Sequence, residues 1–177
     1  MNILEPGQDW KIAALTISIH VHHLFWSEIM NDDVYMKLAL KEAKKAYKKN
    51  EIPVGAVIVL KNQIIGKGYN LKDSTGIVTN HAEIMAIQQA NKKIKDWRLN
   101  GATIYVTLEP CPMCASAIQQ SRISKIVYGA SSNKPYDSEI SMNILNNNFS
   151  NHRVYIEKSS FHNECEELLD SFFEKLR

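Results

Sequence analysis

Few cysteines, little net charge and no internal repeat characterise this sequence of 177 residues, and each scarcity excludes a class of protein. Three cysteines are an odd number, which argues against the disulfide framework of a small secreted domain. The net charge is +2, so composition alone does not indicate nucleic-acid binding. With 45% hydrophobic and 23% charged residues, the chain has the composition of a globular protein.

The N-terminal region contains a largely apolar stretch, residues 12–26, that is too short and too polar to span a bilayer. No basic region precedes it and no small-residue cleavage site follows, which disfavours a secretory signal. Its histidines, His20, His22 and His23, could bind a metal, although a solvated or partly packed extension is the simpler interpretation. We therefore expect a cytoplasmic protein with a non-native or disordered extension at 1–30 and one domain at 31–177.

After residue 30 the sequence alternates between strand and helix patterns. Strands are expected at 54–60, 64–68, 102–108, 126–129 and 154–157. Helices are expected at 32–50, 81–91, 111–122 and along an apolar stripe from Phe161 to Leu176. We expect a loop at 71–79 and a surface loop around a short helix at 131–151. This alternation predicts an α/β sandwich with helices on both faces of a five-stranded mixed sheet.

The first expected helix has two distinct faces. Asp32 or Asp33 can cap its N-terminus, and apolar residues recur at helical spacing behind them. The other face is basic: Lys37, Lys41, Lys44, Lys45, Lys48 and Lys49. A solvated face is the main interpretation of these lysines, with contact to phosphates as the alternative.

Two short motifs carry the candidate chemistry: His81-Ala82-Glu83 and Pro110-Cys111-Pro112-Met113-Cys114. Cysteines at positions i and i+3 of a first helical turn lie on one face and can share a tetrahedral zinc. His81 can supply a third ligand, which leaves the fourth position open for water, as in catalytic zinc sites. Glu83, two residues away, can transfer protons between that water and a leaving amine.

Each motif also has a simpler interpretation. The C-x-x-C could be a redox pair, although the flanking prolines and the H-x-E upstream disfavour it. Asn80 is a good N-cap, and Glu83 at the third helical position would complete a capping box. Cys165 lies on the apolar stripe of the last helix and is expected in the core.

The combination H-x-E…P-C-x-x-C is typical of zinc-dependent nucleobase deaminases. Between residues 30 and 173 the sequence closely resembles the bacterial tRNA-specific adenosine deaminases, which convert an anticodon wobble adenosine to inosine. The resemblance rests on the blocks 52–57 (IPVGAV), 68–70 (GYN), 81–86 (HAEIMA), 102–111 (ATIYVTLEPC), 121–123 (SRI), 151–154 (NHRV) and 170–173 (DSFF). The zinc pattern is common to the deaminase superfamily, whereas the last two blocks favour the tRNA branch.

The resemblance implies a cytidine-deaminase-like three-layer α/β/α sandwich, a homodimer, one zinc per subunit and an anticodon stem-loop as partner. It also implies that Asn70 hydrogen-bonds the flipped base. Ile52, Pro53 and the backbone of Ala82 would form the base pocket. Asn151 and Phe173 would hold the splayed neighbouring nucleotides, with core packing as the alternative for Phe173. Recognition of an unstacked loop base in a pocket is common among RNA-reading proteins.

Two other functions compete with this one. The nearest is a small-molecule deaminase acting on guanine or cytosine, which would share the zinc pattern. A binding module with a purely structural zinc belongs to a different class. The open fourth ligand position and Glu83 argue against the structural zinc.

Overall fold

The computed structural model describes residues 32–147 and 151–177, and Asp32–Arg177 forms one compact unit. The interpretations of residues 12–26 and of His20, His22 and His23 concern residues outside this described part. Within the described ranges, no helix has the length and apolar character needed to cross a membrane.

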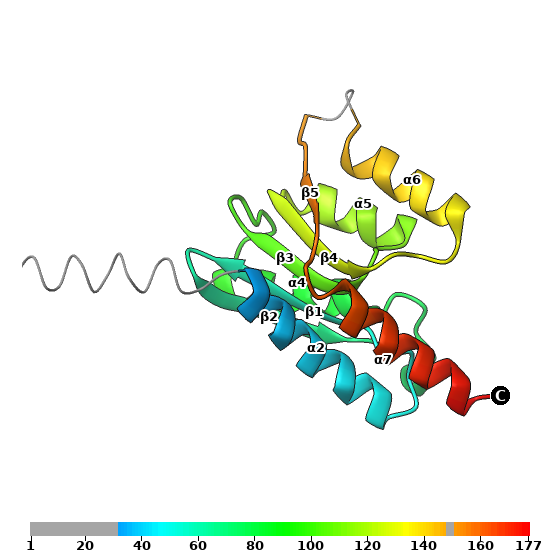
Figure 1. The fold of residues 1–177 in the computed structure, drawn as a ribbon. Coiled ribbons are helices and arrows are strands. Elements are labelled where there is room, and N and C mark those ends of the chain that lie inside the picture. The colour runs from blue at the N-terminus through cyan, green and yellow to red at the C-terminus, as the bar shows by residue number, and fades with distance from the viewer. Residues whose placement is uncertain (1–31, 148–150) are drawn as a thin grey trace, which may run out of the picture. The chain divides into compact units, whose positions relative to one another are not determined.

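In the described part of the chain, five strands form one mixed sheet, as predicted (Figure 1). Their order, which the sequence analysis did not predict, is β2-β1-β3-β4-β5. Strand β1 pairs antiparallel with β2 and β3, whereas β4 runs parallel to both β3 and β5. The strands span β1 (Gly55–Leu60), β2 (Gln63–Tyr69), β3 (Thr103–Leu108), β4 (Lys125–Ala130) and β5 (Tyr155–Lys158).

Helices cover both faces of the sheet (Figure 1), which confirms the three-layer α/β/α sandwich. One layer contains α2 (Asp32–Lys48) and α7 (His162–Lys175). The other contains α4 (Ala82–Ile94), α5 (Pro112–Gln120) and α6 (Pro135–Leu145). A four-residue helix, α3 (Lys72–Thr75), lies between β2 and α4.

The core follows the alternation of strand side chains. In β1, Ala56 and Ile58 pack toward the layer of α4 and α5, while Val57 and Val59 pack toward α2. Strand β1 is apolar on both faces because both of its faces are covered. The lysine face of α2 is exposed, in keeping with the solvated interpretation. Cys165 is 1% exposed and belongs to the core, as expected.

Four local expectations need correction. The expected loop at 71–79 contains α3, which is too short to show a helical period. The short helix expected within the loop at 131–151 is the eleven-residue α6, which takes up half of that region. Asp32 and Asp33 lie inside the first turn of α2 instead of before it. Leu176 follows the end of α7 and is 65% exposed, so the apolar stripe does not reach it.

Candidate active site

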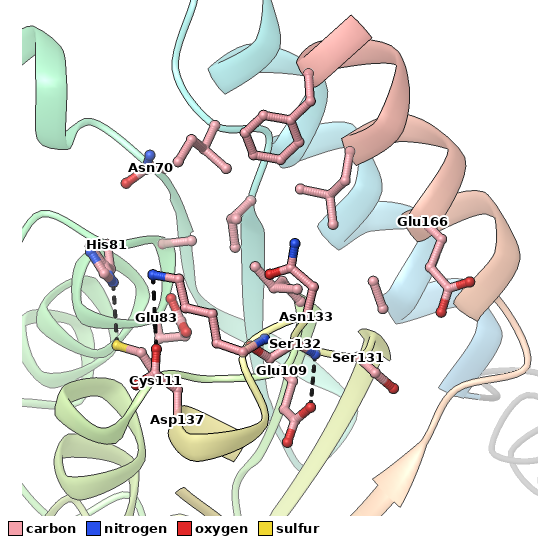
Figure 2. A pocket seen from close by; sticks show the side chains of 18 of the residues that line it. Asn70, His81, Glu83, Glu109, Cys111, Ser131, Ser132, Asn133, Asp137 and Glu166 are labelled. Carbon is pink, nitrogen blue, oxygen red and sulfur yellow. Dashed lines mark hydrogen bonds and ion pairs between the residues drawn. The ribbon is translucent and has the colours of Figure 1, made fainter.

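Three side chains that can bind a metal meet where α4 and α5 begin. His81 and Cys111 are the N-cap residues of these helices, and Cys114 lies one turn into α5. Pro112 suits the first position of α5, where no backbone N–H is needed. The Nδ1 atom of His81 lies 3.7 Å from the Cys111 sulfur and 3.5 Å from the Cys114 sulfur. The two motifs, 30 residues apart in the sequence, therefore form one cluster. Figure 2 shows two of its members, His81 and Cys111, side by side.

The geometry of this cluster fits a tetrahedral zinc ion. Zinc binds histidine nitrogen at about 2.0–2.1 Å and cysteine sulfur at about 2.3 Å, which places such atoms roughly 3.5 Å apart. The three ligand atoms of His81, Cys111 and Cys114 all lie within 4.8 Å of one another. Three protein ligands also leave one tetrahedral position for a water or substrate atom.

The two thiols differ in their electrostatic surroundings. Hydrogen bonds from Cys114 and His81 lower the pKa of Cys111 to about 4, against the opposing effect of burial. The hydrogen bond to Cys111, together with burial, raises the pKa of Cys114. A thiolate is therefore already present at neutral pH, and thiolate is the form that binds metal.

Glu83 lies in the first turn of α4 and is 4% exposed. Burial raises the pKa of its carboxyl to about 7, and the charge on Cys111 acts in the same direction. A carboxyl group with a pKa near the working pH is well suited to accept and donate protons. The capping-box interpretation is wrong: His81 is the N-cap of α4, and the Asn80 amide donates instead to the Thr75 hydroxyl at 2.9 Å.

A pocket of about 510 Å³ opens beside this cluster (Figure 2). It is lined by residues from both helix layers and from the loop after β4. Of the residues that sequence analysis predicted to bind substrate, four line the pocket together with His81, Glu83 and Cys111: Ile52, Asn70, Ala82 and Phe173. The pocket is therefore contiguous with the cluster of His81, Cys111 and Cys114, called the metal group below.

Two predicted substrate residues do not line this pocket. Pro53 is buried and lies between Ile52 and Val54 in the chain, and both of these neighbours line the pocket. Asn151 is exposed, and its side-chain oxygen accepts a hydrogen bond from Arg122 at 2.6 Å. Phe173 is 41% exposed, whereas its neighbour Phe172 is buried, so Phe172 rather than Phe173 fills the core.

Sequence reasoning missed two buried carboxylates that support the pocket walls. Glu109 is 6% exposed and accepts hydrogen bonds from the Ser132 N–H (2.9 Å) and the Ser138 hydroxyl. Glu51 is fully buried and contacts Asn70. A glutamate beside an apolar strand is a weak signal of such a role, because its hydrogen-bond partners lie about 20 or more residues away.

Comparison with known proteins shows what this chain is similar to. The sequence pattern of the MafB19-like deaminase family matches residues 30–177. The tRNA-specific adenosine deaminase of Bacillus subtilis is 45% identical over 146 residues, covering 82% of this chain and 91% of that protein. The protein of the same name from Buchnera aphidicola is 41% identical over 150 residues, covering 82% and 96%.

Solved structures show the same similarity. One, from work on A-to-I editing by tRNA:A34 deaminases at the wobble position, has a TM-score of 0.71 and 36% identity, covering 77% of this chain and 99% of that one. A guanine deaminase from Nitrosomonas europaea has a TM-score of 0.67 at 19% identity, covering 78% and 82%, and thus shares the fold.

Proposed function

Because this chain belongs to the tRNA-specific adenosine deaminase family, within the MafB19-like deaminases, we propose that it converts the wobble adenosine of a tRNA anticodon to inosine and releases ammonia. The single observation that carries this proposal is that three features occur together in one site. A His-Cys-Cys group, a buried glutamate and a pocket meet at the N-termini of α4 and α5.

His81, Cys111 and Cys114 would hold one zinc ion per subunit. The chemistry that zinc supplies when bound is a nucleophilic water at neutral pH, because the ion lowers the pKa of the water. Glu83 accepts one proton from the attacking water and delivers a proton to the exocyclic amine, which leaves as ammonia. The oxygen of the water remains on the carbon that carried the amine, and its second proton remains on the ring, so adenine becomes hypoxanthine.

The pocket walls orient the base for this attack. Asn70 presents a hydrogen-bonding amide, while Ile52 and Ala82 shape the pocket and Pro53 supports it. Phe173 has an exposed ring at the pocket, on which an unstacked nucleotide can lie. Asn151 would contact a further anticodon nucleotide. The family resemblance supports a homodimer, and a tRNA substrate places the enzyme in the cytoplasm.

A substrate panel tests this function. The zinc-loaded protein is incubated with an anticodon stem-loop carrying adenosine at the wobble position, and separately with free adenosine, adenine, guanine and cytosine. Mass spectrometry detects the gain of 1 Da that replacing an amine by an oxygen produces. We expect inosine in the stem-loop and no turnover of free compounds. Turnover of a free base without turnover of the stem-loop would show a small-molecule deaminase instead.

A further inference from the structure

Glu51 is a charged side chain with no exposed surface, and it lies directly before the pocket residue Ile52. Its backbone N–H donates to the carbonyl of Ala46 at 3.1 Å, which fixes the turn after α2. A buried carboxylate is costly unless donors satisfy its oxygens. The partners of Glu51 therefore indicate what its charge does in the fold.

Four donors from two other parts of the chain reach this carboxylate. One oxygen accepts from the Asn70 side-chain nitrogen and from the Asp73 N–H, both at 3.2 Å. The other oxygen accepts from Ser74, at 2.6 Å from its N–H and 2.5 Å from its hydroxyl. Burial would raise the pKa of Glu51, but the hydrogen bonds from Ser74 and Asp73 outweigh burial and lower it. Glu51 is thus ionised at neutral pH.

This ionised carboxylate determines which way the Asn70 amide faces. A carboxylate only accepts hydrogen bonds, so the nitrogen end of the amide must point at Glu51. The backbone N–H of Asn70 donates to the Val54 carbonyl at 3.0 Å, which holds the residue at a second point. The amide oxygen and the second N–H then remain for a base in the pocket.

The same carboxylate also fixes the segment between Asn70 and the metal group. Its hydrogen bonds to Asp73 and Ser74 hold α3, the helix near the start of the segment 71–80. The ends of this segment are joined by a hydrogen bond from the Leu71 N–H to the Asn80 carbonyl at 3.0 Å. The next residue is His81, so one buried charge contacts both the base-recognition residue and the chain that leads to a metal ligand.

We propose that Glu51 is a positioning residue for base recognition, which acts by holding the Asn70 amide in one orientation relative to the metal group. The proposal rests on the proposed function in one respect, that Asn70 contacts the base. In a Glu51→Gln variant, one carboxylate oxygen is replaced by an N–H₂ group, which cannot accept a hydrogen bond from the donors of Asn70, Asp73 or Ser74. Either the Asn70 amide must flip, which exchanges the donor and acceptor that it offers to the base, or α3 must move away from residue 51.

The test is a double-mutant cycle with Glu51→Gln, Asn70→Ala and the combination of both. We expect Glu51→Gln to retain zinc and to lower kcat/KM by roughly tenfold or more, the usual effect of losing a hydrogen bond to a charged group, with most of the change in KM. In the Asn70→Ala background, Glu51→Gln should change kcat/KM by less than about twofold.

Glu42→Gln is the matched control, because Glu42 is also buried (5% exposed) but pairs with Lys45 on α2. It should leave KM unchanged. If Glu51→Gln does not fold, Glu51→Asp enters the same cycle, since a shorter carboxylate cannot reach both Asn70 and α3. The proposal would be overturned if a Glu51 variant lowered kcat/KM by the same factor in the wild-type and the Asn70→Ala backgrounds. It would also be overturned if the variant lost zinc while its KM stayed unchanged.

The cycle is measured on whichever substrate the wild-type protein deaminates. A protein that deaminates a free base and not the stem-loop would contradict the proposed function, while the coupling between Glu51 and Asn70 would still be measured on that base. The failure of one proposal is therefore distinguishable from the failure of the other.

Discussion

At the scale of single residues, the proposed mechanism assigns metal binding and proton transfer to two neighbouring residues at the start of α4. His81 is the N-cap of α4, with an extended backbone (φ −78°, ψ 156°), and its ring nitrogen lies close to the two cysteine sulfurs. Glu83 lies two residues later, buried beside the same pocket. Because the two side chains have different tasks, their loss should be distinguishable by experiment.

We expect Cys111→Ala and Glu83→Ala to fail in different ways. Cys111→Ala removes a ligand, so it should lose zinc and lower the free energy of unfolding, since metal binding and folding are coupled. Glu83→Ala should retain about one zinc per chain and lose activity by roughly 10²–10⁴-fold, the range for a general acid–base group. Metal analysis and single-turnover kinetics measure both effects. An active Glu83→Ala protein with full zinc would contradict the mechanism.

At the scale of elements, β2 lies very close to α4 beside the site. A Cβ atom on Gly68 would lie 2.1 Å from the Ala82 carbonyl oxygen and 2.6 Å from the Ala86 nitrogen. Only a glycine lets β2 pass this close to the helix that carries Glu83 and follows His81. The position of the metal group thus depends on a residue that does not contact it.

Gly68→Ala should therefore push the first turn of α4 outward. We expect a loss of about 1–3 kcal/mol in unfolding free energy, the usual cost of overpacking, together with weaker zinc binding. Chemical denaturation and a zinc-chelator competition measure the two effects. Lys67→Ala, at the exposed neighbouring position in the same strand, is the control and should change neither. If the Gly68→Ala protein were destabilised but bound zinc with normal affinity, the contact between β2 and α4 would not determine the geometry of the metal group.

The start of α2 is joined to the sheet by a polar network. Asp32 accepts hydrogen bonds from the Tyr105 hydroxyl (2.6 Å) and from Lys125 (2.7 Å), which also pairs with Glu157 at 2.9 Å. Partial burial alone would raise the pKa of Asp32, but the bonds from Lys125 and Tyr105 lower it. An ionised Asp32 therefore stabilises the folded state.

This lowered pKa gives a pH dependence of known sign. The stabilisation by Asp32 is complete above its unfolded pKa, near 3.8, and is lost as the pH falls through the lower folded value. Asp32→Asn should cost about 0.5–1 kcal/mol at pH 7, since the pair is partly exposed. The difference from wild type should disappear at the acid end of a denaturation series from pH 7 to 2. A constant difference across that series would show that the charge is not responsible.

At the scale of the whole molecule, the catalytic unit is expected to fold and act without the residues before Met30. The family match begins at residue 30, and the described unit begins at Asp32 with its bonds to β3 and β4. Every residue of the candidate site lies within that unit.

A chain that starts at Met30 should therefore retain its thermal unfolding temperature, zinc content and kcat/KM. A chain that starts at Val34 is the control: it lacks Asp32 and also Asp33, which accepts a hydrogen bond from the Ser160 hydroxyl, and it should unfold at a lower temperature. Calorimetry, metal analysis and the stem-loop assay compare both with the full chain. Loss of activity or solubility on removing residues 1–29 would show that the N-terminal region is part of the domain.

The sequence by itself determined the layers of this protein and its metal group. The spacing of apolar residues along the sequence reflects which face of a strand or helix is buried, so it can be read locally. A C-x-x-C at a helix start places two sulfurs on one face regardless of the remaining fold. His81, Glu83, Cys111 and Cys114 were therefore predictable from short motifs. So was Asn70 as a pocket residue, through its family resemblance.

Only the tertiary structure decided what supports these residues. Glu51 reaches Asn70 and Ser74 across 19 and 23 positions, and Glu109 reaches Ser138 across 29. The helix α3 forms where Glu51 accepts its backbone N–H groups, and Asn80 is not the N-cap that its sequence position predicted. Such partners are brought together by the packing of distant segments, and local periodicity contains no information about which distant segment will supply a donor to a buried charge.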